Sequence, residues 1–529
     1  MKPTSYKQHP VTEKYDAIII GSGMGGLAVA AILAKQGKKA LVLEKHYTAG
    51  GFTHTFKRKN YEWDVGIHYI GAVDKKTRTL RRFFDYITDG KLEWADMGEV
   101  YDRIVFGEKE YQFVKGVDNW KARMKEYFPS AADQNSIDDY VELVKKANSA
   151  FRPYFMEKAM PPVIGKVMGL FMGASYKKYT QRTTLDVMRE ITGNKQLIGV
   201  LAGQYGDYGL PPSQSSFAIH ALVANHYFNG GYYPVGGAGR ILETILPVIE
   251  LAGGKVYINA EVKEIIIRDN KATGVKMADG KEILSDIVIS NAGFANTYSK
   301  LIPSQNGSRL GEYLKQVQPS AAHLSLYIGL QHTAKELNLP KANYWIYPDN
   351  YDHDENLRNY LGNPEAPLPV TYISFPAAKD PDFENRFPGR STIEVIGFAP
   401  YEWFAKWEGT QWHHRGSDYE TMKEQCTQRM LEQLYRFVPQ VKGKIDHCEL
   451  STPLSTVNFV NYPNGEIYGL SHTPERFALK FLRPKTPVKN LYLTGQDIAT
   501  CGVGGALMSG VLTASAILKK NIAGEVLGK

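Results

Sequence analysis

Residues Tyr15–Gly51 read YDAIIIGSGMGGLAVAAILAKQGKKALVLEKHYTAGG and decide the fold of the N-terminal part of the chain. The apolar run Ala17–Ile20 predicts a strand that is buried on both faces, as in a parallel sheet. The stretch Leu27–Ala34 predicts a helix, which Gly37 is placed to end. A second apolar run, Ala40–Leu43, predicts another buried strand. The order of strand, helix and strand is typical of a Rossmann-type unit.

Three glycines follow the first strand in the spacing G-x-G-x-x-G, at Gly21, Gly23 and Gly26. In this pattern the first glycine allows a tight turn, the second lets backbone approach a pyrophosphate, and the third lets the helix pack on the strand. The unpaired N–H groups at the helix start attract phosphate. Glu44 lies 18 residues after Gly26, near the spacing of an acid that binds ribose hydroxyls. The stretch predicts a dinucleotide site without deciding between NAD and FAD.

The C-terminal end of the chain carries a second strand, glycine turn and helix start. Leu491–Leu493 predicts the strand, and Thr494–Asp497 predicts the turn. A glycine-rich run then leads into a predicted helix at Leu507–Leu518. NAD needs no such late element, whereas the ribityl chain and ring of FAD have use for a second helix start and for an acid such as Asp497. We therefore expect the dinucleotide to be FAD.

The composition is that of an ordinary globular chain of 529 residues, 43% apolar and 22% charged. The three cysteines, Cys426, Cys448 and Cys501, show no C-x-x-C spacing, which argues against a disulfide framework, a zinc site or an iron–sulfur cluster. We expect no metal. No zinc-finger or concentrated basic motif indicates nucleic-acid binding. The polar N-terminus lacks the apolar core of a signal peptide, and we expect a cytoplasmic protein.

One segment, residues 161–178, indicates contact with a membrane surface. It contains the run PPVIGKVMGLFMGA at Pro161–Ala174, followed by Lys177 and Lys178. The run is shorter than the roughly 18 residues of a spanning helix but suits a membrane interface. The net charge of +8 favours an anionic surface. A buried helix, or a lid over an apolar cavity, explains the segment equally well. We expect a peripheral protein on the inner face of a membrane.

The middle of the chain predicts helices at Ile137–Phe151 and at Arg240–Ala252. Two aromatic, glycine-rich stretches, Tyr61–Gly71 and Gly230–Gly239, suit backbone that lies close to a flat ligand. Residues 301–444 are rich in aromatic side chains and predict either an apolar substrate cavity or an aromatic core. Short strands are predicted at Val256–Ile258, Val262–Ile267, Ala272–Met277 and Ile283–Ile289.

These pieces together resemble the flavoprotein amine-oxidase and phytoene-desaturase superfamily, and the likeness extends from Tyr15 to Leu518. The closer resemblance is to the retinol saturase and carotenoid isomerase branch. The polar start differs from the membrane-targeting segment of eukaryotic retinol saturases, so residence in the endoplasmic reticulum is not expected. The phrases that carry the branch are GIHYIG (Gly66–Gly71), GDYGLPPSQSSFAIHALVANHYFNGGYYPVGG (Gly206–Gly237), SNAG (Ser290–Gly293) and NGEIYGL (Asn464–Leu470).

The resemblance implies an α/β fold: a Rossmann-type FAD-binding domain from discontinuous segments, and an α+β substrate domain with a mixed sheet and helices. The FAD-binding domain would comprise residues 1–73, 234–296 and 444–529. The substrate domain would comprise residues 74–233 and 297–443, including the membrane-interface segment 161–178.

The resemblance also implies which residues hold FAD. The first glycine motif would lie on the pyrophosphate, Glu44 and Lys45 at the adenosine ribose, and the backbone of Val262 at the adenine. The second glycine pair and the start of the C-terminal helix would lie beside the flavin, and Asp497 would reach the ribityl chain or the pyrophosphate. By motif match the cofactor-binding residues are Gly21, Ser22, Gly23, Met24, Gly25, Gly26, Glu44, Lys45, Gly50, Gly51, Phe52, Val262, Gly495, Asp497, Gly504, Gly505 and Ala506.

The predicted reaction is reduction of a carbon–carbon double bond in a retinoid, carotenoid or isoprenoid-like lipid by reduced flavin, with NAD(P)H as one candidate electron donor. A desaturase and a cis–trans polyene isomerase use the same machinery. Two further hypotheses are a membrane-associated polyene carrier with structural FAD and an NAD-only dehydrogenase, and the oligomeric state is left open. A positioned acid or water would protonate one carbon, and a histidine acid suits neutral pH. The candidates lie in the two aromatic, glycine-rich stretches or, for His226, on the predicted helix that leads into the second: His68, Tyr69, His226, Tyr232 and Tyr233.

Overall fold

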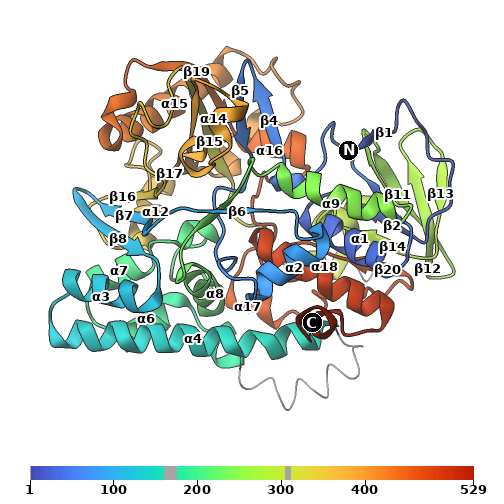
Figure 1. Ribbon diagram of the computed structural model, residues 1–529, viewed down its shortest axis with the longest axis horizontal. Coiled ribbons are helices and arrows are strands. Elements are labelled where there is room, and N and C mark those ends of the chain that lie inside the picture. Colours follow the sequence, from blue (N-terminus) through green and yellow to red (C-terminus); the bar gives the residue numbers. More distant parts are fainter. Residues whose placement is uncertain (1, 160–175, 304–310, 529) are drawn as a thin grey trace.

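The computed structural model describes residues 2–159, 176–303 and 311–528. Two large sheets, three small ones and a layer of helices make up the architecture of the described residues. A six-stranded sheet with its helices lies at the right in Figure 1, a seven-stranded sheet lies at the upper left, and the long helix α4 (Ala131–Ala159) runs along the lower left.

The six-stranded sheet is parallel throughout and draws its strands from distant parts of the chain. The predicted strands at Ala17–Ile20, Ala40–Leu43 and Leu491–Leu493 are confirmed. Their apolar residues suit a sheet covered on both faces. In spatial order the strands are β1 (Thr4–Ser5), β10 (Lys255–Ile258), β3 (Ala40–Leu43), β2 (Ala17–Ile20), β14 (Val288–Ser290) and β20 (Leu491–Leu493).

Three helices pack beside this sheet. Helix α1 (Met24–Lys35) is buried from Met24 to Ala34 and contacts both α9 (Arg240–Leu251) and α18 (Gly502–Leu518). Both α1 and α18 begin earlier than the predicted starts at Leu27 and Leu507, because their first turns contain glycines that leave room for neighbouring backbone. Packing here overrides the low helix propensity of glycine.

One predicted strand, Ile283–Ile289, is wrong. The run divides into β13 (Glu282–Leu284), which joins an antiparallel sheet with β11 (Val262–Arg268) and β12 (Lys271–Met277), and β14 of the parallel sheet. Asp286 lies at the division, exposed and 3.0 Å from the Lys271 ammonium. A charged side chain in the middle of the run cannot be buried on both faces, so the chain leaves one sheet before it enters the next.

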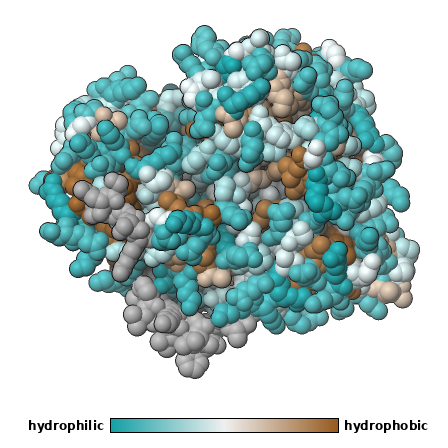
Figure 2. Space-filling view, turned by 180° about the vertical axis from the view of Figure 1, so that it is seen from behind, coloured by the Kyte–Doolittle hydropathy of each residue, from teal (hydrophilic) through white to brown (hydrophobic). Residues whose placement is uncertain are grey.

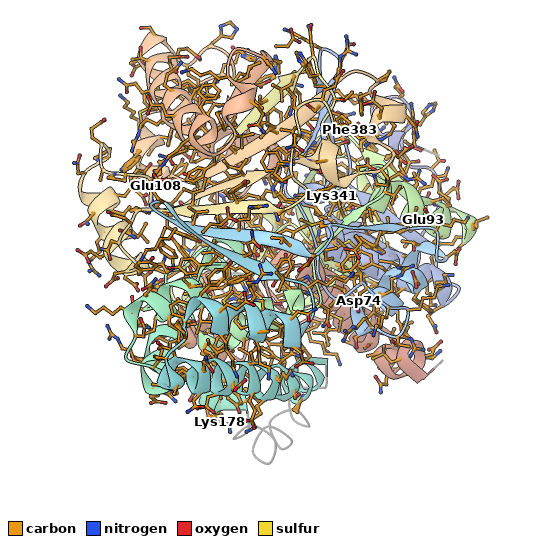
Figure 3. The ribbon with its side chains drawn as sticks, turned by 60° about the vertical axis from the view of Figure 1, so that its left-hand side comes forward. Asp74, Glu93, Glu108, Lys178, Lys341 and Phe383 are labelled. Carbon is orange, nitrogen blue, oxygen red and sulfur yellow. The ribbon has the colours of Figure 1, made fainter. Side chains whose placement is uncertain are left out.

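The seven-stranded sheet is mixed, since β7 and β16 pair in parallel while the other pairs are antiparallel. Helix α15 (Ser417–Phe437) packs against it, and Figure 3 shows Glu108 at the tip of the β7–β8 hairpin. Strand β19 joins this sheet, although the resemblance assigns residues 444–529 to the FAD-binding part. The spatial order is β19 (Ile445–Ser451), β15 (His323–Leu330), β18 (Ser391–Phe398), β17 (Thr371–Ser374), β16 (Asn343–Tyr347), β7 (Val100–Phe106) and β8 (Lys109–Val114).

The predicted helix Ile137–Phe151 is confirmed as part of α4, which contacts α3 (Val117–Tyr127), α6 (Thr184–Ile191) and α8 (Phe217–Tyr227). The segment predicted to meet a membrane falls mostly on residues 160–175, outside the described residues.

Two small antiparallel sheets pair β4 (Thr55–Arg58) with β5 (Tyr61–Asp64) and β6 (Trp94–Asp96) with β9 (Tyr232–Pro234). The remaining helices are α2 (Thr79–Thr88), α7 (Lys195–Leu201), α10 (Phe294–Asn296), α11 (Gly311–Leu314), α12 (His353–Gly362), α13 (Pro376–Lys379), α14 (Phe383–Arg386), α16 (Pro453–Val460), α17 (Pro474–Ala478) and α19 (Ile522–Gly528).

Across the described ranges, no single helix has both the length and the apolar character needed to cross a membrane. Helices α18 and α19 meet the criteria only as a pair, and they are bent by 114° relative to each other. Figure 2 shows a largely hydrophilic face on which apolar residues form separate patches.

Gly329 of the seven-stranded sheet allows us to test how this sheet packs against the β4–β5 hairpin, which carries Tyr61. A Cβ atom on Gly329 would lie 2.7 Å from Cγ of the buried Tyr61 ring. Gly329→Ala is therefore expected to lower the free energy of unfolding by about 1–3 kcal/mol through overpacking. Urea denaturation followed by circular dichroism measures the change.

The matched control is Gly397→Ala in the neighbouring strand β18, because its Cβ atom would lie 3.8 Å from the nearest atom, Cε of Met430. This substitution is expected to leave stability unchanged or to raise it by about 0.5–1 kcal/mol. Equal stability of the two variants would contradict the proposed packing.

Candidate functional site

A single connected cavity of about 2280 Å³ begins at the carboxyl ends of the parallel strands and continues into the layer of aromatic residues beside the seven-stranded sheet. In parallel α/β sheets this edge is where ligands bind. The cavity has two halves: a dinucleotide half lined largely by loop backbone, and an aromatic chamber lined by apolar side chains.

The glycine turn after β2 forms one wall of the dinucleotide half. Gly21 adopts φ +93°, and its N–H donates to the Leu43 carbonyl at 2.8 Å. Gly21, Gly23, Met24 and Gly25 line the cavity. Helix α1 starts at this turn without a side-chain cap, so its N–H groups and positive dipole end are available to an anion.

Two residues of this motif organise the wall from behind. Ser22 is fully buried, and its hydroxyl donates to Glu44 at 2.6 Å while accepting from the Gly50 N–H at 2.9 Å. Gly26 is needed for packing, because a Cβ atom there would overlap the Gly21 carbonyl. Both residues support the wall from outside the cavity lining.

Glu44 lines the cavity and holds two turns together. One carboxylate oxygen accepts from the Ser22 N–H at 2.9 Å and from its hydroxyl, and the other accepts from the His46 N–H at 2.9 Å. The second oxygen keeps a lone pair for a ribose hydroxyl. At the same end, Lys45 pairs with the exposed Glu261 at 3.0 Å, and Val262 lies on the cavity wall.

The opposite wall comes from the end of the chain and meets the first wall at Asn291. A Cβ atom on Gly25 would lie 2.7 Å from the Gly495 Cα, and one on Gly495 would lie 2.7 Å from Oδ1 of Asn291. A Cβ atom on Gly23 would lie 2.8 Å from Nδ2 of the same amide. The glycines thus make room for the Asn291 side chain between the two walls. In the sequence, Asn291 stood out only as part of the phrase SNAG, and nothing indicated its role.

Asp497 lines the cavity but already has two backbone partners. Its carboxylate accepts from the Phe294 N–H at 2.7 Å and from the Leu470 N–H at 3.0 Å. Burial raises its pKa, while these two N–H groups oppose the rise. Asp497 therefore ties the middle segment to the C-terminal segment, a role that the sequence did not indicate.

The start of α18 and the loop after Gly50 complete this half. Gly504, Gly505 and Ala506 line the cavity, as do Gly51 and Phe52, whereas Gly50 lies behind them. Gly505 must lack a side chain, because a Cβ atom would overlap the Thr500 carbonyl. Gly51 adopts φ +56°, and its Cβ atom would lie 2.8 Å from the Gly23 Cα.

These features fit FAD. Backbone forms a glycine cradle that side chains would fill, and two uncapped helix starts, of α1 and α18, reach the same cavity from opposite ends of the chain. An elongated dinucleotide with an anionic centre matches this distribution of N–H groups.

The structure places some of the five predicted proton donors on the cavity wall and the others away from it. His68, Tyr69 and His226 line the cavity, but Tyr232 and Tyr233 do not. Tyr233 is buried and donates its hydroxyl to Asp64, while the Tyr232 hydroxyl donates to the Asn229 carbonyl at 3.4 Å. Their strand β9 pairs with β6, and neither strand contributes a residue to the cavity lining. As candidate proton donors, Tyr232 and Tyr233 are therefore withdrawn.

His226 lines the cavity as a hydrogen-bond acceptor. Its Nε2 accepts from the Gly71 N–H at 2.7 Å, which requires an unprotonated nitrogen. Burial lowers the pKa of His226 to about 4, in agreement with that bond. A neutral imidazole fixed in this way has no acidic proton to give at neutral pH.

His68 has a partner that the sequence did not reveal. Its Nδ1 lies 2.6 Å from Oε2 of Glu394, whose side chain is fully buried behind it in β18. Burial raises the pKa of Glu394 to about 8 and lowers the pKa of His68 to about 4. The pair shares one proton and is neutral overall at pH 7. Lys379, whose pKa burial lowers to about 7, donates to the His68 carbonyl at 2.9 Å.

The aromatic chamber lies beyond these residues. Of the aromatic residues in the predicted cavity region 301–444, only Trp345, Tyr372 and Phe398 line it within the described structure, and several others pack between the seven-stranded sheet and α15. The Trp345 and Tyr372 ring centroids lie 4.4 Å apart. Apolar lining is completed from the helical layer and two strands by Phe151, Phe155, Ile219, Leu222, Val223, Val370 and Ile396.

Comparisons with known proteins agree with this geometry. The family model described as flavin containing amine oxidoreductase matches residues 24–518. The chain is a flavin-binding oxidoreductase in fold and site. It belongs to the flavin containing amine oxidoreductase family.

Individual proteins and structures are similar to this chain over most of its length. The all-trans-retinol 13,14-reductase of Danio rerio is 40% identical over 533 residues, which cover 97% of this chain and 87% of that protein. The chloroplastic prolycopene isomerase of Arabidopsis thaliana is 25% identical, over 94% of this chain and 82% of that protein. An oxidoreductase structure from Methanosarcina mazei superposes with a TM-score of 0.63 at 16% identity, covering 95% of this chain and 100% of the other, and shares the fold.

The Glu44 contacts predict a loss of FAD on substitution. Glu44→Ala leaves the N–H groups of Ser22 and His46 without their acceptor and removes the carboxylate expected to bind the ribose. We expect FAD to bind about 10- to 100-fold more weakly, the equivalent of about 1.5–3 kcal/mol for a hydrogen-bonded charged group. Flavin absorbance retained after dialysis, with the dissociation constant from titration of the apoprotein, measures the effect.

Glu261→Ala is the matched control, because Glu261 lines the same end of the cavity but makes only an exposed ion pair with Lys45. Its FAD affinity is expected to stay within about threefold of the unchanged protein, since exposed pairs contribute little. Full flavin occupancy in Glu44→Ala would show that Glu44 does not hold the ribose.

Proposed function

We propose that this chain is an FAD-dependent reductase of a carbon–carbon double bond in a long apolar polyene, with all-trans-retinol as the substrate to test first. The observation that carries the proposal is the 40% identity to the Danio rerio all-trans-retinol 13,14-reductase over 97% of the chain. The aromatic chamber, which continues directly from the dinucleotide half, supports an apolar substrate beside the flavin.

Reduction of an alkene needs a hydride equivalent, a proton and a site that excludes water. Bound and reduced, the flavin supplies the hydride equivalent. The glycine turn, Glu44 and the start of α18 would hold the cofactor along the two walls. Apolar side chains of the chamber orient the polyene and exclude water. The neutral pair of His68 and Glu394 avoids an unpaired charge beside the substrate.

NAD(P)H is the proposed source of electrons for the flavin, and a membrane surface is the proposed source of the polyene. The net charge of +8 and the poor water solubility of polyenes support association with an anionic surface. We propose a cytoplasmic protein bound peripherally to the inner face of a membrane. Reduction of the bound flavin by NADH or NADPH, and flotation with anionic liposomes, test the two proposals separately.

The reaction itself is tested by anaerobic photoreduction of the FAD-loaded protein followed by all-trans-retinol. The flavin absorbance is expected to return at a rate that depends on retinol, and mass spectrometry should find a product heavier by two hydrogen atoms. A reaction mixture without retinol is the control and should stay bleached.

Two different outcomes would contradict the reductase. Isomerised polyene with the flavin still reduced would favour the isomerase class, to which the Arabidopsis thaliana relative belongs by name. Polyene binding without reoxidation or isomerisation would favour a carrier with structural FAD.

A further inference from the structure

A carboxyl group, Asp207, lies on the cavity wall where the two halves meet. It ends the 3₁₀ turn η2 (Tyr205–Asp207), is half-buried and lines the cavity. Its own carbonyl lies 3.7 Å from Sγ of Cys501, the residue that precedes α18. The preceding residue, Gly206, abuts the Trp345 ring of the chamber, with which a Cβ atom there would overlap. Asp207 therefore stands between the wall assigned to the flavin and the chamber assigned to the polyene.

Hydrogen-bond counting places a proton on this carboxyl group. The Tyr69 hydroxyl lies 2.9 Å from Oδ2 of Asp102 and 3.0 Å from Oδ2 of Asp207. A phenol has one hydrogen, so it can donate to one of the two carboxyl groups, and the other must donate to the phenol oxygen.

The partners of the two carboxyl groups decide between them. Asp102 also accepts from the Gln204 amide at 2.7 Å and from the Asn343 amide at 2.8 Å, which stabilise a carboxylate. Among the described residues, Tyr69 is the only side-chain hydrogen-bond partner of the Asp207 carboxyl group. Burial raises the pKa of Asp102 to about 7, and its amide partners hold it from rising further. Burial and the nearby Asp102 raise the pKa of Asp207 well above its ordinary value, with no such amide partners to oppose the rise. Asp207 is thus the neutral acid of the pair, and Asp102 is the carboxylate.

The three proton-donor candidates from the sequence that line the cavity, His226, His68 and Tyr69, are poorer proton donors. His226 accepts a backbone hydrogen bond, and His68 shares a single proton with Glu394 within a neutral pair. Burial raises the pKa of Tyr69 well above its usual range, so its phenol is a weak acid. A carboxylic acid kept neutral by its surroundings is a stronger acid than a neutral imidazole or a buried phenol, and it still carries its proton at neutral pH.

We propose that Asp207 is the catalytic residue that protonates the alkene, with Tyr69 and Asp102 as positioning residues behind it. This assignment rests on the proposed function. The π bond of the alkene breaks, one carbon takes the hydride that the reduced flavin supplies, and the other carbon forms its C–H bond with the proton of Asp207. The electron pair of the broken O–H bond stays on Asp207 as a carboxylate. A proton from solvent restores the acid, because two adjacent carboxylates in a buried site repel each other.

The test is Asp207→Asn, which keeps the shape of the side chain but has no acidic proton. In the FAD-loaded and photoreduced protein, reoxidation by all-trans-retinol is expected to slow by about a hundredfold or more. FAD occupancy and retinol binding, followed by flavin absorbance and by fluorescence, are expected to match the unchanged protein. The matched control is Asp354→Asn, because Asp354 is a buried aspartate outside the cavity that accepts hydrogen bonds from Ser213. It should react at the rate of the unchanged protein.

A second readout does not depend on turnover. Infrared difference spectra at neutral pH, between the unchanged protein and Asp207→Asn, should show the carbonyl band of a protonated carboxylic acid, shifted in D₂O. The Asp354→Asn spectrum should keep that band. Absence of the band, or reoxidation of Asp207→Asn at the unchanged rate, overturns the role of Asp207. If retinol does not reoxidise the flavin of the unchanged protein, the proposed function is wrong, and the donor role of Asp207 with it. If retinol reoxidises the unchanged protein and Asp207→Asn equally fast, only the donor role is wrong.

Discussion

The close approach of Gly25 to Gly495 across the Asn291 amide is the constraint on which the rest of the structure depends. It brings together the start, the middle and the end of the chain, and each contributes a strand to one parallel sheet. A side chain at either glycine would separate the walls and open the dinucleotide half. Asp497 reinforces the same arrangement, because its carboxylate accepts from the Phe294 N–H of the middle segment and from the Leu470 N–H. Glu44 holds two turns of the N-terminal wall together through the N–H groups of Ser22 and His46.

The second constraint is the burial of ionisable groups between the two parts of the molecule. Lys379 is almost fully buried and donates to the His68 carbonyl, to Ser374 at 2.8 Å and to Asn343, whose amide in turn donates to Asp102. One hydrogen-bonded network thereby connects the histidine on the cavity wall with the paired acids beside the chamber. Buried charges are costly unless paired, so the protonation state on one side of the cavity affects the protonation state on the other through this network.

The sequence was most informative where function restricts local backbone. The glycines at 21, 23 and 26 and the strands at Ala17–Ile20 and Leu491–Leu493 could be read directly, because their requirements are local. Asn291, Glu394 and Asp207 could not be found in this way. Their partners lie far away in sequence: Glu394 meets His68 at a separation of 326 residues, and Asp207 meets Tyr69 at 138. Residue type and local pattern carry no signal for such pairs. Tyr233 shows the converse, because its aromatic, glycine-rich surroundings suggested a site, whereas its hydroxyl donates to Asp64 and the residue does not line the cavity.

The meeting of the two distant walls is tested most directly by the flavin content of purified Gly25→Ala, with Gly362→Ala as control, because a Cβ atom on Gly362 meets no atom within 4 Å. We predict that Gly25→Ala retains its far-ultraviolet circular dichroism and elutes as folded protein, yet lacks flavin absorbance even after incubation with FAD, while the control is yellow. A folded Gly25→Ala protein with full flavin occupancy would contradict the claim that the two distant walls meet to form the cofactor site.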